Sequence, residues 1–199
     1  MDMSRFLIND GEKPLDKIVT DGGYCSIFRT IACVGDSLSS GEFESLNEKG
    51  EKGYHDYFEY SWGQYIAREA GCKVYNFSRG GMTAKEYCEA FADANDFWNP
   101  DKKAQAYIIA LGVNDICNRH MPIGTVGDID LKDYNNNKDT FAGHYGKIIQ
   151  KYKEIQPKAK FFLVNLPKGR SADILVPFTK LMYDLADLFD YTYVLDLAE

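Results

Sequence analysis

Short apolar runs alternate with segments of helical periodicity along most of the chain. The apolar runs span residues 30–34, 73–77, 106–111, 160–165 and 191–195. The intervening segments 61–70, 83–94, 140–156 and 173–189 have the pattern of helices. Alternation of this kind, with strands that are apolar nearly throughout, is typical of a parallel sheet covered by helices on both faces.

Local signals support two of the helix starts and the packing of the last helix. Ser61 is followed three residues later by Gln64, and Thr83 by Glu86, so that each pair forms a capping box. In the last helical segment an apolar stripe at three- and four-residue spacing is predicted to pack on the sheet; it consists of Phe178, Leu181, Met182, Leu185, Leu188 and Phe189.

These patterns predict an α/β fold, a three-layer doubly wound sandwich whose five parallel strands follow the flavodoxin-like order 2-1-3-4-5. Residues 30–199 are expected to form this domain, after an N-terminal extension over residues 1–29. Within the extension, Asp21-Gly22-Gly23 indicates a short hairpin. The acidic and aromatic run 51–60 is interpreted either as an exposed loop or as a wall that faces a substrate.

Polar, glycine-bearing loops follow the first three predicted strands. They are Gly-Asp-Ser at 35–37, Ser-Arg-Gly-Gly at 78–81 and Gly-Val-Asn-Asp at 112–115. In open parallel sheets, ligands bind outside the carboxyl ends of the strands, where the strand order reverses. Since all three loops are expected at that edge, we place the candidate site there.

Composition and charge narrow the function classes. The chain has 199 residues and a net charge of −7 without a long basic run, which disfavours nucleic-acid and anionic-membrane partners. The first residues lack the pattern of a signal peptide, and no window is apolar for long enough to span a membrane. Five cysteines, an odd number without a C-x-x-C pair, favour reduced thiols and a cytoplasmic protein, unless a leader has been removed.

Three short motifs resemble the sequence blocks of one enzyme family. "GDSLS" follows the first strand, "NFSRGGMTA" the second and "GVND" the third. In this order and at these strand ends they are similar to the first three blocks of the SGNH (GDSL) hydrolases, a family of esterases and acylhydrolases. The likeness extends over roughly residues 30–197. It implies hydrolysis of a small-molecule ester without a metal or cofactor.

The resemblance also implies a role for three residues. Ser37 would supply the attacking hydroxyl, and the oxyanion hole would consist of the Ser37 backbone N–H, the Gly81 backbone N–H and the Asn114 side-chain amide. Glycine at 81 allows close approach of the backbone to a ligand. A helix that begins after Thr83 would turn its positive end toward the developing charge.

Each of these residues also has a purely structural interpretation. A serine at a strand-to-helix turn is commonly a helix cap, Gly80-Gly81 alone would be a turn, and Asn114-Asp115 alone a loop cap. We assign Asp36 to structure, as a carboxylate that holds the Ser37 loop through nearby backbone groups, and expect a similar role for Asp115.

In the family that the motifs resemble, the remaining catalytic pair is an aspartate and a histidine with the spacing D-x-x-H. This block is not found in the sequence. The residues three positions before the histidines at 55, 120 and 144 are lysine, cysteine and phenylalanine. Asp196 comes too early, at the end of the last strand, to be the missing aspartate. Three interpretations follow: the sequence is a fragment of a longer protein, His120 or His55 serves as a substitute base, or the chain is a non-catalytic relative that binds a ligand such as a carbohydrate.

Other chemistries have weaker support. Cys117 and His120 could join a metal site, but a second pair of ligands is not evident. Motifs for nucleotide phosphates and the G-x-S-x-G motif are absent from the sequence. The sequence also lacks a long apolar insertion typical of a lipase lid, which favours short acyl groups, including acetyl on a carbohydrate. It indicates no oligomeric state.

Overall fold

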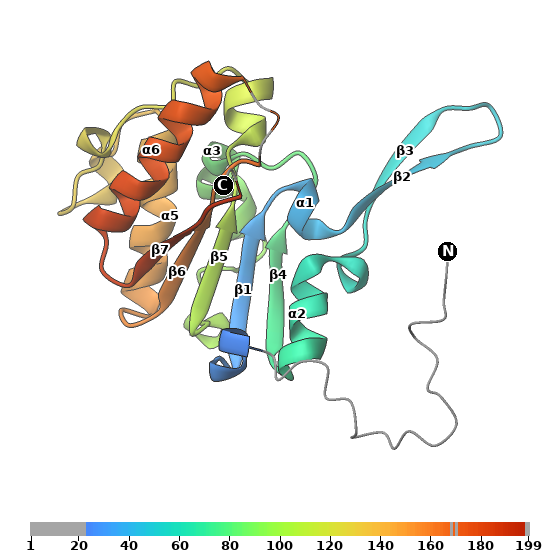
Figure 1. Ribbon diagram of the computed structural model, residues 1–199, viewed down its shortest axis with the longest axis horizontal. Coiled ribbons are helices and arrows are strands. Elements are labelled where there is room, and N and C mark those ends of the chain that lie inside the picture. The colour runs from blue at the N-terminus through green and yellow to red at the C-terminus, as the bar shows by residue number, and fades with distance from the viewer. Residues whose placement is uncertain (1–22, 168, 170, 198–199) are drawn as a thin grey trace.

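A five-stranded parallel sheet forms the centre of the computed structural model, which describes residues 23–167, 169 and 171–197 (Figure 1). Its strands are β1 (Thr30–Gly35), β4 (Lys73–Ser78), β5 (Ala106–Ala110), β6 (Lys160–Val164) and β7 (Thr192–Leu195). The order β4-β1-β5-β6-β7 confirms the predicted 2-1-3-4-5 arrangement. Gly35 pairs with both Ser78 and Ala110, so the carboxyl ends of β1, β4 and β5 lie level at one edge of the sheet.

One face of the sheet carries the larger hydrophobic core. It is covered by α5 (Phe141–Ile155), by α6 (Ala172–Leu188) and by the segment 84–94. Four residues of the predicted stripe on α6 are buried, and Phe189, just past the helix, is buried as well. Phe178 stacks on Phe141 with 5.4 Å between the ring centroids, so α5 and α6 pack on each other as well as on the sheet.

The opposite face is covered only in part. There α2 (Trp62–Ala70) packs on β1 and β4, and a Cβ on Gly63 would lie 2.8 Å from the Cys33 sulfur, which shows how closely the helix approaches. Over β6 and β7, Phe162 stacks on Tyr193, and Tyr193 is exposed. The expectation of a sheet with helices on both faces is therefore confirmed, and within the described residues Tyr193 of β7 remains exposed on this face.

The predicted helix over 83–94 has three parts: α3 (Ala84–Glu86), a π-helix (Tyr87–Phe91) and α4 (Ala92–Ala94). It begins as its capping box predicts, since the Thr83 hydroxyl accepts a hydrogen bond from the Glu86 amide at 3.0 Å. The Ser61 hydroxyl caps α2 in the same way. The side chains of Glu86 and Gln64, however, bond to Arg79 and to the Val74 carbonyl, so the structure describes only the hydroxyl half of each predicted capping box.

A β-hairpin projects from the carboxyl edge of the sheet, away from the helices (Figure 1). It follows the short helix α1 (Ser37–Ser40) and consists of β2 (Glu42–Leu46) and β3 (Lys52–Asp56). Of the two interpretations of residues 51–60, that of an exposed loop is therefore wrong for Lys52–Asp56, which form β3. Both faces of this ribbon are largely exposed, so it lacks the alternation of apolar and polar positions that marks a half-buried strand.

The remaining elements are short. Among the described residues, 3-10 helices span Gly23–Ile27, Phe58–Tyr60, Pro100–Lys102, Val126–Asp128 and Tyr134–Asn136, and a second π-helix spans Val113–Asn118. Gly23 thus begins a helix, while the rest of the predicted Asp21-Gly22-Gly23 hairpin, like most of the N-terminal extension, lies outside the described residues. In the part of the chain that the structure describes, no helix has the length and apolar character needed to cross a membrane.

Candidate active site

The three polar loops are joined to one another by hydrogen bonds. The Arg79 amide donates to the Gly35 carbonyl at 3.3 Å, which links the second loop to the first. The Asn114 side-chain amide donates to the Met82 carbonyl at 3.1 Å and to the Asp36 carboxylate at 3.4 Å, which links the third loop to both others. The loops expected to meet at the carboxyl edge of the sheet do so.

Ser37 is the first residue of α1, and the residues on either side of it determine the shape of this turn. The Asp36 side chain caps the helix by accepting the Leu38 amide at 3.1 Å, as expected for a structural carboxylate. A Cβ on Gly35 would lie 2.3 Å from the Ser39 hydroxyl, so only glycine lets α1 fold back onto the strand. Gly41, with φ +76°, ends the helix after one turn.

The polar groups of Ser37 and Gly81 are left open by this arrangement. Among the described residues, the Ser37 hydroxyl, the Ser37 amide and the Gly81 amide have no hydrogen-bond partner. Gly81 has φ +72°, in the region that favours glycine, and a Cβ built on it meets no atom within 4 Å. Two free backbone donors and a hydroxyl therefore stand in adjoining loops.

The Asn114 side chain has less freedom. Both of its contacts, to Met82 and to Asp36, use the amide nitrogen, and its carbonyl oxygen accepts from the Asn118 side chain at 2.7 Å. Of the two donated bonds, the one to Asp36 is near the outer limit for a hydrogen bond. The amide hydrogen that Asn114 directs toward Asp36 is therefore the one available to an additional acceptor.

Two buried carboxylates lie beneath the loops. Asp36 is almost fully buried, and burial raises the pKa of its carboxyl above its ordinary value. Asp115 is fully buried and accepts the Ala84 amide, at the start of α3, with distances of 2.9 Å and 3.1 Å. Burial raises the pKa of Asp115 to about 6, against hydrogen bonds from backbone amides that lower it. Both carboxylates are structural partners of the site.

Sequence reasoning missed two residues that position the loops. Asp56, the last residue of β3, accepts the Gly80 amide at 3.2 Å and 3.1 Å and also accepts the Ser40 hydroxyl. It therefore ties the hairpin to α1 and to the loop before Gly81. Its role depends on a contact across 24 positions of the chain, which no local pattern reveals. The second residue is Asn118, which lies one helical turn after Asn114 and donates to its side chain. The i, i+4 spacing of the two residues could have indicated this contact.

The histidines lie elsewhere. His55 is on the hairpin, with its Nε2 2.8 Å from the Ser45 hydroxyl and its ring stacked on Phe43. His144 is in the first turn of α5, and its Nε2 lies 2.8 Å from the Asp139 carboxylate. His120 is exposed, in the loop that follows the second π-helix, with φ +53°. None of the described hydrogen bonds joins a histidine to Ser37.

Asp196 lies at the same edge of the sheet but is engaged with its neighbours. It follows β7 directly and accepts hydrogen bonds from the Asn165 side chain at 2.8 Å and from the Tyr183 hydroxyl at 3.1 Å. These contacts tie the end of β7 to β6 and α6.

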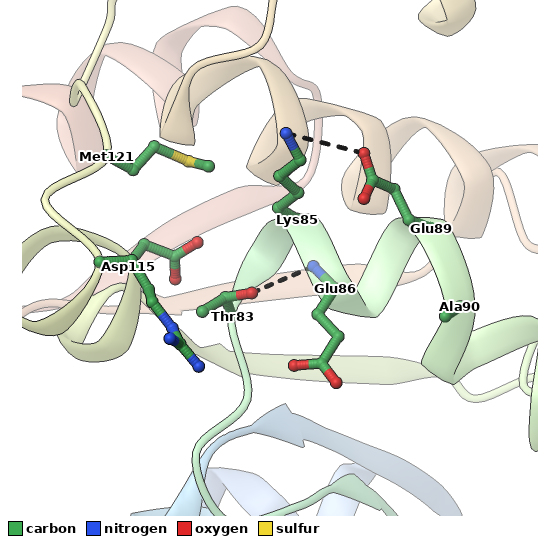
Figure 2. Close-up of a pocket in the computed structure, with 8 residues that line it drawn as sticks. Thr83, Lys85, Glu86, Glu89, Ala90, Asp115 and Met121 are labelled. Atoms are coloured by element: carbon green, nitrogen blue, oxygen red, sulfur yellow. Dashed lines mark hydrogen bonds and ion pairs between the residues drawn. The ribbon is translucent and has the colours of Figure 1, made fainter.

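Two hollows flank the loops. One, of about 340 Å³, lies beside α3 and is lined among others by Thr83, Lys85, Asp115 and Met121 (Figure 2). In this view Lys85 is paired with Glu89, 3.9 Å away. The other hollow, of about 530 Å³, lies on the opposite side, between α1 and the base of the hairpin.

The chain matches the family model of GDSL-like lipases and acylhydrolases over residues 31–170. This match includes all three polar loops and the strands β4, β5 and β6. No curated protein sequence is similar enough to this chain to count as a match.

Solved structures with the same fold are distant in sequence. A possible lipase from Chitinophaga pinensis is 20% identical, with a TM-score of 0.54, over 85% of this chain and 68% of that one. A family two carbohydrate esterase from Clostridium thermocellum, in complex with cellohexaose, is 17% identical, with a TM-score of 0.59, over 85% of this chain and 54% of that one. A protein of the G-D-S-L family from Desulfitobacterium hafniense is 17% identical, with a TM-score of 0.55, over 84% of this chain and 77% of that one. At these identities the similarity shows the shared fold.

Proposed function

Because the chain belongs to the family of GDSL-like lipases and acylhydrolases, which supports an ester-hydrolase function, we propose that it is a serine esterase whose nucleophile is Ser37. Its substrate is a carboxylic ester with a short acyl group, including one carried on a carbohydrate. The observation that carries the proposal is that the Ser37 hydroxyl and the backbone amides of Ser37 and Gly81, in adjoining loops, have no hydrogen-bond partner among the described residues.

The reaction runs in two steps. In the first, the Ser37 oxygen attacks the ester carbonyl carbon and loses its proton, and the carbonyl oxygen becomes negative. The Ser37 and Gly81 amides and the Asn114 side chain donate to this oxygen, which stabilises it most at the transition state. When the carbonyl re-forms, the alcohol leaves with a proton and an acyl group remains on Ser37. Water then attacks the acyl group, and the acid is released as Ser37 regains its proton.

The residue that takes the proton from Ser37 is not assigned. A serine hydroxyl without a base is a weak nucleophile at neutral pH, although an oxyanion hole and substrate binding alone retain about 10³–10⁴-fold acceleration over water. With no D-x-x-H in the sequence, we expect slow turnover in which solvent takes the proton, so that the rate rises with pH.

The test is hydrolysis of p-nitrophenyl acetate by the wild type and by Ser37→Ala. The matched control is Ser26→Ala, since Ser26 is exposed on the 3-10 helix at the other end of β1. We expect the enzyme-dependent rate to vanish in Ser37→Ala and to persist in Ser26→Ala. Equal rates in the wild type and Ser37→Ala would refute the assignment.

A second candidate function is ligand binding without catalysis on the same scaffold. The observation that favours it is the position of the histidines, none of which is hydrogen-bonded to Ser37 among the described residues. Under this alternative, a short-chain ester or its acid product would bind at the loops, and Ser37→Ala would not change the rate of ester hydrolysis.

A further inference from the structure

The larger hollow beside the site has a distinctive lining. It measures about 530 Å³ and lies between α1 and the base of the hairpin, with walls formed by Gly41, Glu42, Phe43, Tyr57 and Tyr60. This volume is within the range of sites that hold small molecules. Three of the five lining residues are aromatic.

The aromatic rings are open to solvent. Phe43 is 51% exposed, Tyr57 48% and Tyr60 82%. Tyr57 and Tyr60 stack on each other with 5.2 Å between their centroids, and Phe43 stacks on His55 at the same distance. Each ring thus has one stacked neighbour, while the group as a whole presents apolar faces that the fold does not bury. Exposed apolar surface gathered in one place is typical of a binding site.

This hollow is connected to Ser37 through two backbone hydrogen bonds. The Gly41 amide donates to the Ser37 carbonyl, and the Tyr57 amide donates to the Gly41 carbonyl at 3.1 Å. A Cβ on Gly41 would lie 2.3 Å from the Tyr57 carbonyl oxygen, so the two segments are in close contact. The backbone that lines the hollow is therefore joined directly to the segment that carries the proposed nucleophile.

Among the described residues that line the hollow, Glu42 is the only one with a charged side chain. Partial burial and the charges of Asp56 and Glu44 raise its pKa above the ordinary value. A carboxylate accepts hydrogen bonds from hydroxyl groups and repels anions. The ligand that suits this lining has apolar C–H faces for the aromatic rings and hydroxyl groups for Glu42, and carries no negative charge. A sugar ring combines these properties, whereas an acyl chain would leave Glu42 unused.

We propose that this hollow binds a pyranose ring in the alcohol half of the ester, and so makes the substrate an acylated carbohydrate. The location of the ring relative to the reaction rests on the proposed function of Ser37. Binding of the sugar itself does not depend on catalysis.

The experiment therefore measures sugar binding in the Ser37→Ala protein, by isothermal titration calorimetry with xylohexaose, cellohexaose and mannohexaose. We expect at least one of these to bind, and Tyr60→Ala to weaken that binding about tenfold through loss of a stacked ring. The matched control is Tyr65→Ala, because Tyr65 is also an exposed tyrosine, on α2, but does not line the hollow. It should change the affinity less than twofold.

Phe43→Ala is the second variant, for the case in which Tyr60→Ala alters the hairpin. The inference is overturned if none of the three sugars binds at 10 mM, or if neither Tyr60→Ala nor Phe43→Ala weakens binding. It is also overturned if both substitutions change only the oligomeric mass in solution, since the hollow would then be a contact between copies of the chain. Esterase activity without sugar binding contradicts this inference alone, and sugar binding without Ser37-dependent hydrolysis contradicts the proposed function alone.

Discussion

The carboxylate of Asp56 accepts the backbone amide of Gly80, with distances of 3.2 Å and 3.1 Å from the amide nitrogen to its two oxygens. Gly80 precedes Gly81, whose amide is the proposed oxyanion donor, and Asp56 also accepts the hydroxyl of Ser40, at the end of the helix that begins with Ser37. One side chain of the hairpin thus holds both halves of the proposed site. We assign Asp56 as a positioning residue.

Asp56→Ala is expected to lower kcat for p-nitrophenyl acetate roughly ten- to a hundredfold with a smaller change in KM, because a small misplacement of a donor affects the transition state most. Asp56→Asn should restore part of the loss, since its amide oxygen can still accept from Gly80. Asp101→Ala, at an exposed carboxylate of the 3-10 helix Pro100–Lys102, serves as the control. Unchanged kcat in Asp56→Ala would contradict this role.

Asn114→Ala tests the side-chain donor of the oxyanion hole. Loss of one such donor lowers kcat by about 10²–10³-fold, or roughly 3–4 kcal/mol of transition-state stabilisation. Initial rates with p-nitrophenyl acetate measure the effect, and Asn136→Ala, at an exposed asparagine, is the control. If Asn114→Ala retained wild-type kcat while remaining folded, the amide would serve only to join the loops.

The expected strands agree with the structure because the strands of a parallel sheet are buried and their apolar runs are continuous. The helices at 62–70 and 141–155 could be located for a related reason, since caps such as Ser61 and amphipathic spacing are local signals. The polar loops could also be placed, because the edge at which they meet follows from strand direction alone.

The hairpin and the two π-helices could not be predicted in this way. The hairpin is exposed on both faces, so burial leaves no pattern in its sequence, and its function depends on Asp56 contacts across the fold. The π-helix at 113–118 differs from an ordinary helical turn in its i→i+5 hydrogen bonds, for which apolar spacing and capping residues give no signal. The contact of Asn118 with Asn114, by contrast, joins residues at i, i+4 spacing and could have been expected from the sequence.

Asp115→Asn should change how stability depends on pH. The pKa of buried Asp115 is raised from 3.8 to about 6, so between these values the folded protein holds a proton that the unfolded chain has lost. The stability that this proton provides is present at pH 4 and is lost as the pH rises through 6. Chemical denaturation should show Asp115→Asn gaining roughly 2–3 kcal/mol relative to the wild type between pH 4 and pH 7.

Asp128→Asn serves as a control in which the effect of pH on stability is expected to have the opposite sign. The hydrogen bond from Lys138 holds the pKa of Asp128 below its ordinary value, so its contribution to stability is present at neutral pH and lost on acidification. Asp128→Asn should therefore cost more stability at pH 7 than at pH 4. A pH profile of Asp115→Asn parallel to that of the wild type would contradict the raised pKa of Asp115.

The three histidines are expected to contribute little to turnover of this chain. His55, His120 and His144 are not hydrogen-bonded to Ser37 among the described residues, and two of them are engaged elsewhere. Each alanine variant should retain the slow esterase rate within about twofold. Strong turnover that disappears in His120→Ala or in His55→Ala would instead identify that residue as the base.

The most direct test of Ser37 as the nucleophile is covalent labelling. The protein is incubated with a fluorophosphonate, digested and mapped by mass spectrometry, with Ser37→Ala and Ser26→Ala treated in parallel. The account predicts a phosphonyl adduct on the peptide that contains Ser37, present in Ser26→Ala and absent from Ser37→Ala. An adduct of equal yield in Ser37→Ala, or labelling spread over unrelated serines, would contradict it.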